Sequence, residues 1–120
     1  MTLGQITPIF RIFDEHKARE FYLDYLGFDV VFEYRFEADA PLYMGIVRDA
    51  CRIHLTEHYG DCCPGGSVRV ESGDLDAYLQ ELTDRQYKYY RPSIEEMPWG
   101  SRDMKIIDPF GNRLIFTGLQ

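Results

Sequence analysis

The chain has 120 residues, of which 45% are hydrophobic and 15% aromatic, enough apolar material for the core of one compact domain. Acidic residues outnumber Lys and Arg by 20 to 13, so the formal net charge is −7. This balance argues against sequence-independent binding to nucleic acid, which depends on cationic side chains meeting phosphates. It leaves two interpretations: simple solubility, or attraction of a cationic ligand.

The cysteines and the N-terminal segment together predict a cytoplasmic protein. The three cysteines, Cys51, Cys62 and Cys63, are odd in number and do not form a disulfide framework. Residues 1–15 lack the basic start and apolar run of a signal peptide. No apolar stretch approaches the roughly 20 residues of a membrane span. We therefore expect reduced thiols, no membrane segment and no nucleic-acid partner.

The first half of the chain reads as strand, helix and three strands. Residues 6–13 form the first expected strand, which Pro8 interrupts. Asp14 then caps a helix that Gly27 ends. Its apolar side chains recur at helical spacing: Ala18, Phe21, Tyr22, Tyr25 and Leu26.

Three strands are expected over residues 29–36, 42–48 and 51–58. The short Asp49-Ala50 step between the last two predicts a hairpin. In the first of the three, strict alternation places four apolar side chains on one face: Val30, Phe32, Tyr34 and Phe36.

The second half repeats this order after the loop sequence GDCCPGG. We expect a strand over 67–71, a helix capped by Ser72 or Asp74, a strand over 87–90, a loop over 91–101 and a closing hairpin of 103–107 and 112–117. RIHLT at 52–56 and RLIFT at 113–117 carry a weak echo of one another. The matched order predicts an internal repeat of two βαβββ modules, about residues 5–58 and 66–118.

Several segments in this order resemble the glyoxalase/bleomycin-resistance/dioxygenase (vicinal oxygen chelate) superfamily. They are LYMGIVRDACRIHLTEHYGD and PWGSRDMKIIDPFGNRLIFT, and the motifs PWG and DPxGN look most like the bleomycin-resistance branch. The resemblance covers essentially the whole chain. It implies an α+β fold with two curved mixed sheets that form a cup and helices outside it.

The same resemblance implies a homodimer. In the bleomycin-resistance branch the subunits exchange the first strand about a proline, and Pro8 matches that hinge. The alternative is that Pro8 is simply an edge-strand residue.

Metal-dependent members of the superfamily place His or Glu ligands on the first and last strand of each module. Carried over by position, these ligands fall on Thr7, His54, Ser67 and Ile115. Ile115 cannot ligate, hydroxyls are poor substitutes for imidazole or carboxylate, and one histidine does not hold a divalent ion. We therefore expect no metal and no cofactor. The alternative is a metal-dependent lyase, isomerase or dioxygenase with an unusual site around His54.

No other catalytic arrangement is evident. Cys62 and Cys63 have no basic neighbour in sequence to lower a thiol pKa. His16 falls on the first turn of the first helix, where a solvated face is the ordinary role. Binding is favoured over catalysis, and no catalytic residue is predicted.

The expected binding surface is aromatic. In the resembling branch, the Trp of PWG and the aromatic residue aligned with Tyr43 stack on the flat bithiazole of the drug, and Gly100 beside Trp99 admits a close approach to the backbone. The predicted ligand-binding residues are Phe32, Tyr34, Tyr43, His54, Ser67, Trp99 and Gly100. The resulting hypothesis is a small-molecule binder that sequesters a glycopeptide-type antibiotic such as bleomycin, or a similar planar ligand.

The chain also departs from the drug-binding pattern. Ser67 and Arg69 stand where that branch often has tryptophans, and the stretch from Phe36 to Leu42 is longer. Arg69, Arg11 and Arg113 are expected to face the cup. A basic floor suits an anion better than bleomycin, so an anion-binding module is a third hypothesis.

Overall fold

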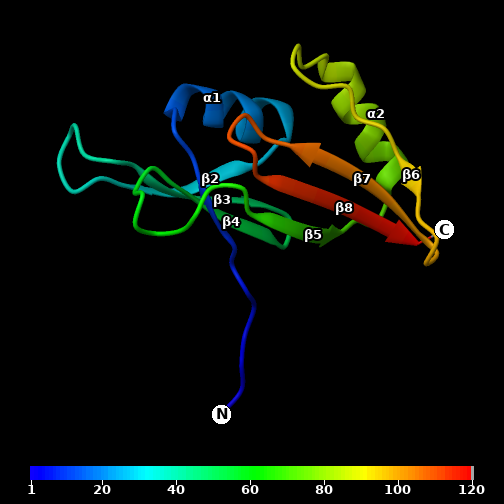
Figure 1. The fold of residues 1–120 in the computed structure, drawn as a ribbon, viewed down its shortest axis with the longest axis horizontal. Coiled ribbons are helices and arrows are strands. Elements are labelled where there is room, and N and C mark those ends of the chain that lie inside the picture. The colour runs from blue at the N-terminus through cyan, green and yellow to red at the C-terminus, as the bar shows by residue number, and fades with distance from the viewer. Residues whose placement is uncertain (120) are drawn as a thin grey trace.

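The computed structural model describes residues 1–119 and shows an α+β fold of two four-stranded mixed sheets with helical segments packed on one side (Figure 1). The first sheet has the order β1-β4-β3-β2: β1 (Ile9–Arg11), β2 (Asp29–Tyr34), β3 (Tyr43–Arg48) and β4 (Cys51–Thr56). The second has the order β5-β8-β7-β6: β5 (Ser67–Glu71), β6 (Glu95–Glu96), β7 (Ser101–Ile107) and β8 (Arg113–Leu119). β1 runs parallel to β4 and β5 runs parallel to β8, and every other pairing is antiparallel. The predicted fold class is confirmed.

The first helical segment forms where the apolar spacing predicts it. Helix α1 (Glu15–Arg19) continues as a π-helix, η1 (Glu20–Tyr25). The Asp14 side chain caps α1 by accepting a hydrogen bond of 2.9 Å from the Lys17 amide. Gly27, at φ +84°, ends the segment in the left-handed conformation. All five predicted apolar positions are buried: Ala18, Phe21, Tyr22, Tyr25 and Leu26.

A β-bulge in β2 corrects the predicted alternation. Val30 pairs with Ile46 and Phe32 pairs with Gly45, so Val31 is the extra residue. The bulge turns Val30 toward the helix side, while Phe32 and Tyr34 stay on the opposite side of the sheet. Phe36 lies beyond the end of the strand.

The strand expected over residues 87–90 is wrong. Gln86 takes a left-handed conformation, φ 51°, at the end of α2 (Leu75–Arg85), and turns follow. The aromatic side chains that suggested a strand pack on the core instead: Tyr87 stacks on Tyr25 with ring centroids 4.6 Å apart, and the Tyr90 hydroxyl donates to the Lys105 carbonyl. The edge strand is β6, within the segment expected to be a loop.

The turn DPFGN joins the two halves of the chain. The buried Asp108 carboxylate accepts hydrogen bonds from the amides of Phe110 and Asn112, the Asn112 side chain and the Tyr22 hydroxyl, the last at 2.6 Å. The Asn112 side chain also donates to the Arg11 carbonyl at 2.8 Å. Burial raises the pKa of Asp108, and its hydrogen bonds oppose that rise. The motif thus fixes β8 against β1 and the first helix.

Residues 1–8 form an extended arm that leaves the body of the molecule (Figure 1). Its apolar side chains are exposed, Leu3 at 82% and Ile6 at 91% of their full surface. Within residues 1–119, no helix is both long and apolar enough to cross a membrane.

Candidate ligand-binding faces

Three rings meet on the side of the first sheet that faces away from α1. The strand register brings Phe32 of β2, Tyr43 of β3 and His54 of β4 together, because Phe32 and His54 both lie opposite Gly45. The Phe32 and Tyr43 rings are nearly parallel, 15° apart, with centroids at 6.1 Å. His54 meets both edge-on, at 5.2 Å from each. We call these rings, with the neighbouring Tyr34, the aromatic face.

His54 is held in one orientation by Tyr43. The Tyr43 hydroxyl lies 2.7 Å from Nδ1 of His54, a hydrogen-bond distance. Burial lowers the pKa of His54 below its ordinary value of 6.5, which favours the neutral imidazole. Burial also raises the pKa of Tyr43, and the nearby Asp61 and Cys62 add to the rise. In the neutral tautomer that carries its proton on Nε2, Nδ1 accepts the hydrogen bond from the phenol.

Gly45 makes room for the ring above it. A Cβ at this position would lie 2.3 Å from Cε1 of Phe32, far inside van der Waals contact. The absence of a side chain lets Phe32 lie flat across β3 and reach His54. Phe32 remains 40% exposed, so the aromatic face is open to a ligand.

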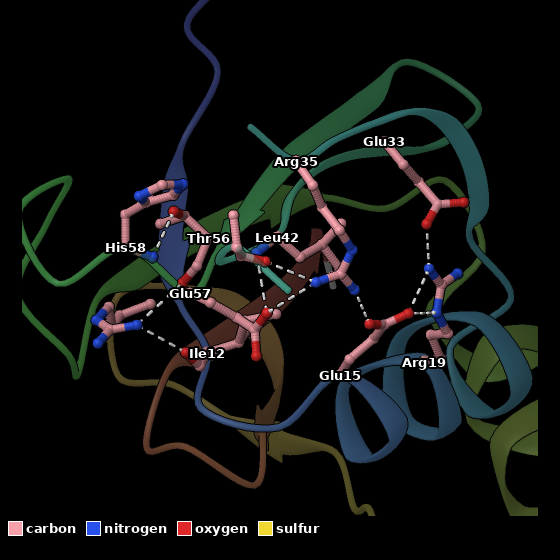
Figure 2. Close-up of polar contacts among 11 residues, drawn as sticks. Ile12, Glu15, Arg19, Glu33, Arg35, Leu42, Thr56, Glu57 and His58 are labelled. Carbon is pink, nitrogen blue, oxygen red and sulfur yellow. Dashed lines mark hydrogen bonds and ion pairs between the residues drawn. The ribbon is translucent and has the colours of Figure 1, made fainter. Parts of the chain in front are cut away.

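A chain of ion pairs fastens the loop beside the aromatic face (Figure 2). Arg19 of α1 pairs with Glu33 of β2 and with Glu15, and Glu15 in turn pairs with Arg35. Arg35 lies 3.9 Å from Glu57, whose carboxylate accepts the Leu42 amide at 2.9 Å. The contacts bind both ends of the 35–42 segment to α1 and to the end of β4, so this longer loop is anchored at its base.

The metal-ligand positions expected from the resemblance do not come together as a metal centre. The residue opposite His54 in β1 is Ile9, while Thr7 lies before the strand begins. Ser67 in β5 lies opposite Arg113 in β8, and Ile115 in β8 lies between Arg69 and Lys105. These donors do not fit a divalent metal. Within residues 1–119, no group of three or more His, Cys, Asp or Glu side chains is placed to hold a metal ion.

Trp99 and Gly100 lie far from the aromatic face in a single chain. They belong to the turn between β6 and β7, at the end of the molecule opposite the β2–β3 loop (Figure 1). Trp99 is 66% exposed, and Gly100 takes φ +99°. One chain therefore separates Trp99 from Phe32, Tyr43 and His54.

Arg11 does not belong to the basic floor that we expected. It is 8% exposed, donates to the carbonyl of Ile12 at 2.9 Å, and lies over the ring of Phe13 at 4.5 Å. Its side chain binds the protein's own backbone. Lys105, which was not predicted to face the cup, lies among the outward cations instead. It lies between the buried Met104 and Ile106, and this alternation could have predicted that Lys105 faces outward.

A groove of about 1190 Å³ runs between the two sheets. Its walls are the arm (Gly4 to Ile6), the β3–β4 turn (Arg48 to Ile53), β5 and the side of α2 that carries Tyr78 and Glu81. Within residues 1–119, the outer edge of β4 has no partner strand beyond Pro8, because β1 and β4 pair only through residues 9–11 and 54–56. β5 likewise pairs only with β8. Two strand edges are thus open along this groove.

Two βαβββ modules with uncovered sheet faces define a glyoxalase-like fold. The family model for glyoxalase superfamily proteins matches residues 1–119, and the chain belongs to this superfamily. No curated protein matches it by sequence.

Solved structures of the same fold include both binding proteins and enzymes. A bleomycin-binding protein from Streptomyces verticillus, in complex with copper(II)-bleomycin, is 26% identical, with a TM-score of 0.73 and coverage of 100% of this chain and 99% of the other. A superfamily member from Sphaerobacter thermophilus is 26% identical, with a TM-score of 0.70 and coverage of 97% and 98%. A glyoxalase-related enzyme from Clostridium phytofermentans is 17% identical, with a TM-score of 0.79 and coverage of 100% and 98%.

Proposed function

We propose that this protein is a metal-free, cytoplasmic homodimer that binds a planar small molecule, in the manner of a protein that sequesters a glycopeptide-type antibiotic. The observation that carries the proposal is the partly exposed cluster of Phe32, Tyr43 and His54. Flat rings held at fixed angles bind another planar system with little loss of side-chain entropy. The bleomycin-binding protein from Streptomyces verticillus, which shares the fold, supports a binding role.

The distribution of the site residues supports a dimer. The strands that carry the aromatic face, β2 to β4, lie away from the β6–β7 turn that carries Trp99 (Figure 1), so a site that uses both needs a second copy. A two-fold dimer brings unlike ends of two identical chains together twice, which makes two equivalent sites.

The arm supplies a way to hold the two copies together. Leu3 and Ile6 are apolar and exposed, and the groove beside β4 and β5 offers open strand edges. An extended segment adds to such an edge through main-chain hydrogen bonds. In this proposal the partner's arm lies in the groove, and Pro8 is the hinge at which the arm leaves β1.

Titration with bleomycin tests the antibiotic part of the proposal. Trp99 is the only tryptophan, so its fluorescence reports binding at the β6–β7 turn. We expect quenching at micromolar drug in the wild type and weaker quenching in Phe32→Ala, and we expect expression to increase bleomycin resistance. Tyr59→Ala, which removes an aromatic side chain that is 89% exposed outside the aromatic face, is the control. The absence of both quenching and resistance would exclude bleomycin as the ligand.

A metal-dependent lyase, isomerase or dioxygenase is the second candidate. It is favoured by the outward position of His54 and by the glyoxalase-related enzyme that shares the fold. Metal analysis of purified protein separates the two functions. Stoichiometric metal that is lost in His54→Ala would favour the enzyme.

A further inference from the structure

The outward face of the second sheet carries cations at adjoining positions. Ile115 in β8 lies directly opposite Arg69 in β5 and Lys105 in β7. Arg113 comes two residues earlier on the same side of β8, opposite Ser67 and Ile107. We call Arg69, Lys105 and Arg113, with Ile115 between them, the basic face.

These cations are close enough to act on one group. Directly opposite residues have Cβ atoms about 5 Å apart, and diagonal neighbours such as Lys105 and Arg113 about 7–8 Å. Both side chains are long and exposed. They are long enough for their charged ends to reach a common point above the half-buried Ile115.

The carboxylates on this side of the sheet lie one row further along the strands. Asp103 is the nearest and is already occupied, because it accepts hydrogen bonds from Arg69, Thr117 and Ser101. Burial raises the pKa of Asp103, but these hydrogen bonds together outweigh it and lower the pKa. Glu71 lies opposite Thr117, and Glu95 lies opposite Asp103.

Lys105 and Arg113 therefore supply the local excess of positive charge. Among the described residues, no carboxylate lies within 4.0 Å of either cation. Arg69 is neutralised by Asp103 through one of its terminal nitrogens, at 3.1 Å from each carboxylate oxygen. The basic face thus has two neighbouring cations without a counterion, on a protein of net charge −7.

We infer that the basic face binds the oxyanion of the ligand, a carboxylate or phosphate, while apolar Ile115 and Ile107 contact the body of the molecule beside it. Ammonium and guanidinium groups bind carboxylate and phosphate oxygens through charge-assisted hydrogen bonds. The same cations repel a metal ion from the position of Ile115. The inference rests on the proposed function and narrows it: the planar ligand carries a negative charge.

Two probes of nearly the same shape, one anionic and one neutral, test the inference. Benzoate and benzamide share a ring, and NMR of ¹⁵N-labelled protein locates binding to either sheet even when it is weak. Sodium chloride at matched ionic strength controls for general screening. We expect benzoate to shift the amides of residues 103–107 and 113–117 in a saturable way, and we expect benzamide and chloride to leave those amides unchanged.

Charge variants locate the effect. Lys105→Gln combined with Arg113→Gln should weaken benzoate binding about tenfold. Lys17→Gln combined with Lys88→Gln, which removes the same charge from α1 and from the turn after α2, should change it less than twofold. Inorganic phosphate alone, tested in the same way, distinguishes a phosphate ligand from a carboxylate.

The outcomes separate this inference from the proposed function. If benzamide shifts residues 32, 43 and 54 while benzoate leaves the second sheet unchanged, a planar ligand still binds but the inference is wrong. If benzoate binds the second sheet and Phe32→Ala has no effect on either probe, the basic face is correct and the aromatic face is not. If neither probe binds either sheet, both proposals fail.

Discussion

The hydroxyl of Tyr43 lies 2.7 Å from Nδ1 of His54, and the ring of Phe32 covers the same imidazole edge-on at 5.2 Å. The three residues come from three neighbouring strands, and Gly45 is the position on which they converge. His54 is thereby a fixed, neutral hydrogen-bonding group on an apolar surface. Its exposed side is available to a ligand.

The first prediction concerns the titration of His54. Because burial lowers its pKa, the unfolded state binds more protons than the folded state as the pH falls through 6.5. The contribution of His54 to stability is therefore present above pH 6.5 and is lost as the pH falls through the lower, folded-state pKa. An NMR titration of the imidazole should give a midpoint below 6.5.

Phe32→Ala should move that midpoint upward toward 6.5, since it opens the imidazole to water. Tyr34→Ala is the matched control, because Tyr34 lies on the same face but the rings that meet His54 are those of Phe32 and Tyr43. A midpoint that does not respond to Phe32→Ala would show that this ring does not bury His54.

Gly45→Ala should alter the aromatic face while the fold survives. The new methyl group would meet the Phe32 ring, which is partly exposed and free to swing outward. We expect a loss of about 1–3 kcal/mol in the free energy of unfolding and a change in the ring-current shifts of His54. Gly60→Ala, where an added Cβ meets nothing within 4 Å, is the control. Unchanged His54 resonances in Gly45→Ala would contradict the packing of Phe32 on this glycine.

Tyr22→Phe tests the connection between the two halves of the chain. The change removes the hydroxyl that donates to Asp108 at 2.6 Å and leaves a buried carboxylate with one donor fewer. Urea unfolding should show a loss of about 1–3 kcal/mol. Tyr59→Phe, at an exposed position, should change stability by less than about 0.5 kcal/mol. Equal values for the two variants would show that the Tyr22–Asp108 hydrogen bond contributes nothing.

Leu3→Asp combined with Ile6→Asp should convert the proposed dimer to a monomer. Charges on the arm oppose its burial in an apolar part of the partner's groove. Sedimentation velocity measures the change, and Tyr59→Asp provides a substitution outside the arm. A wild-type protein that sediments as a monomer at micromolar concentration would contradict the dimer directly.

The sequence predicts the strands well where hydrophobic alternation, turn residues and helix caps agree. Asp14, Gly27 and the Asp49-Ala50 turn each mark a boundary that the structure shows within a few residues. The bulge at Val31 was not predictable, because an inserted residue leaves the local composition unchanged while reversing the side that each neighbour faces. The strand predicted over residues 87–90 was wrong for another reason: aromatic residues occur both in strands and in turns that pack on helices.

The candidate site was predictable only in part. Alternation correctly places His54 on the side of the sheet that faces away from the helix, and the resemblance indicates Tyr43 as a binding residue. The stacking of Phe32 over Gly45, the pairing of Ile9 with His54, and the cations around Ile115 all depend on which residues lie opposite one another across strands. Strand register is a tertiary property that a single sequence does not state.

Calorimetric titration with 2-naphthoate in the presence of EDTA tests the central claim most directly, because this probe is both planar and anionic and the chelator removes any metal. The account predicts saturable binding by the wild type with no metal present. It also predicts binding at least about tenfold weaker in Phe32→Ala combined with Tyr43→Ala. Binding that requires an added divalent metal, or that is equally strong in the double variant, would contradict a metal-free aromatic site.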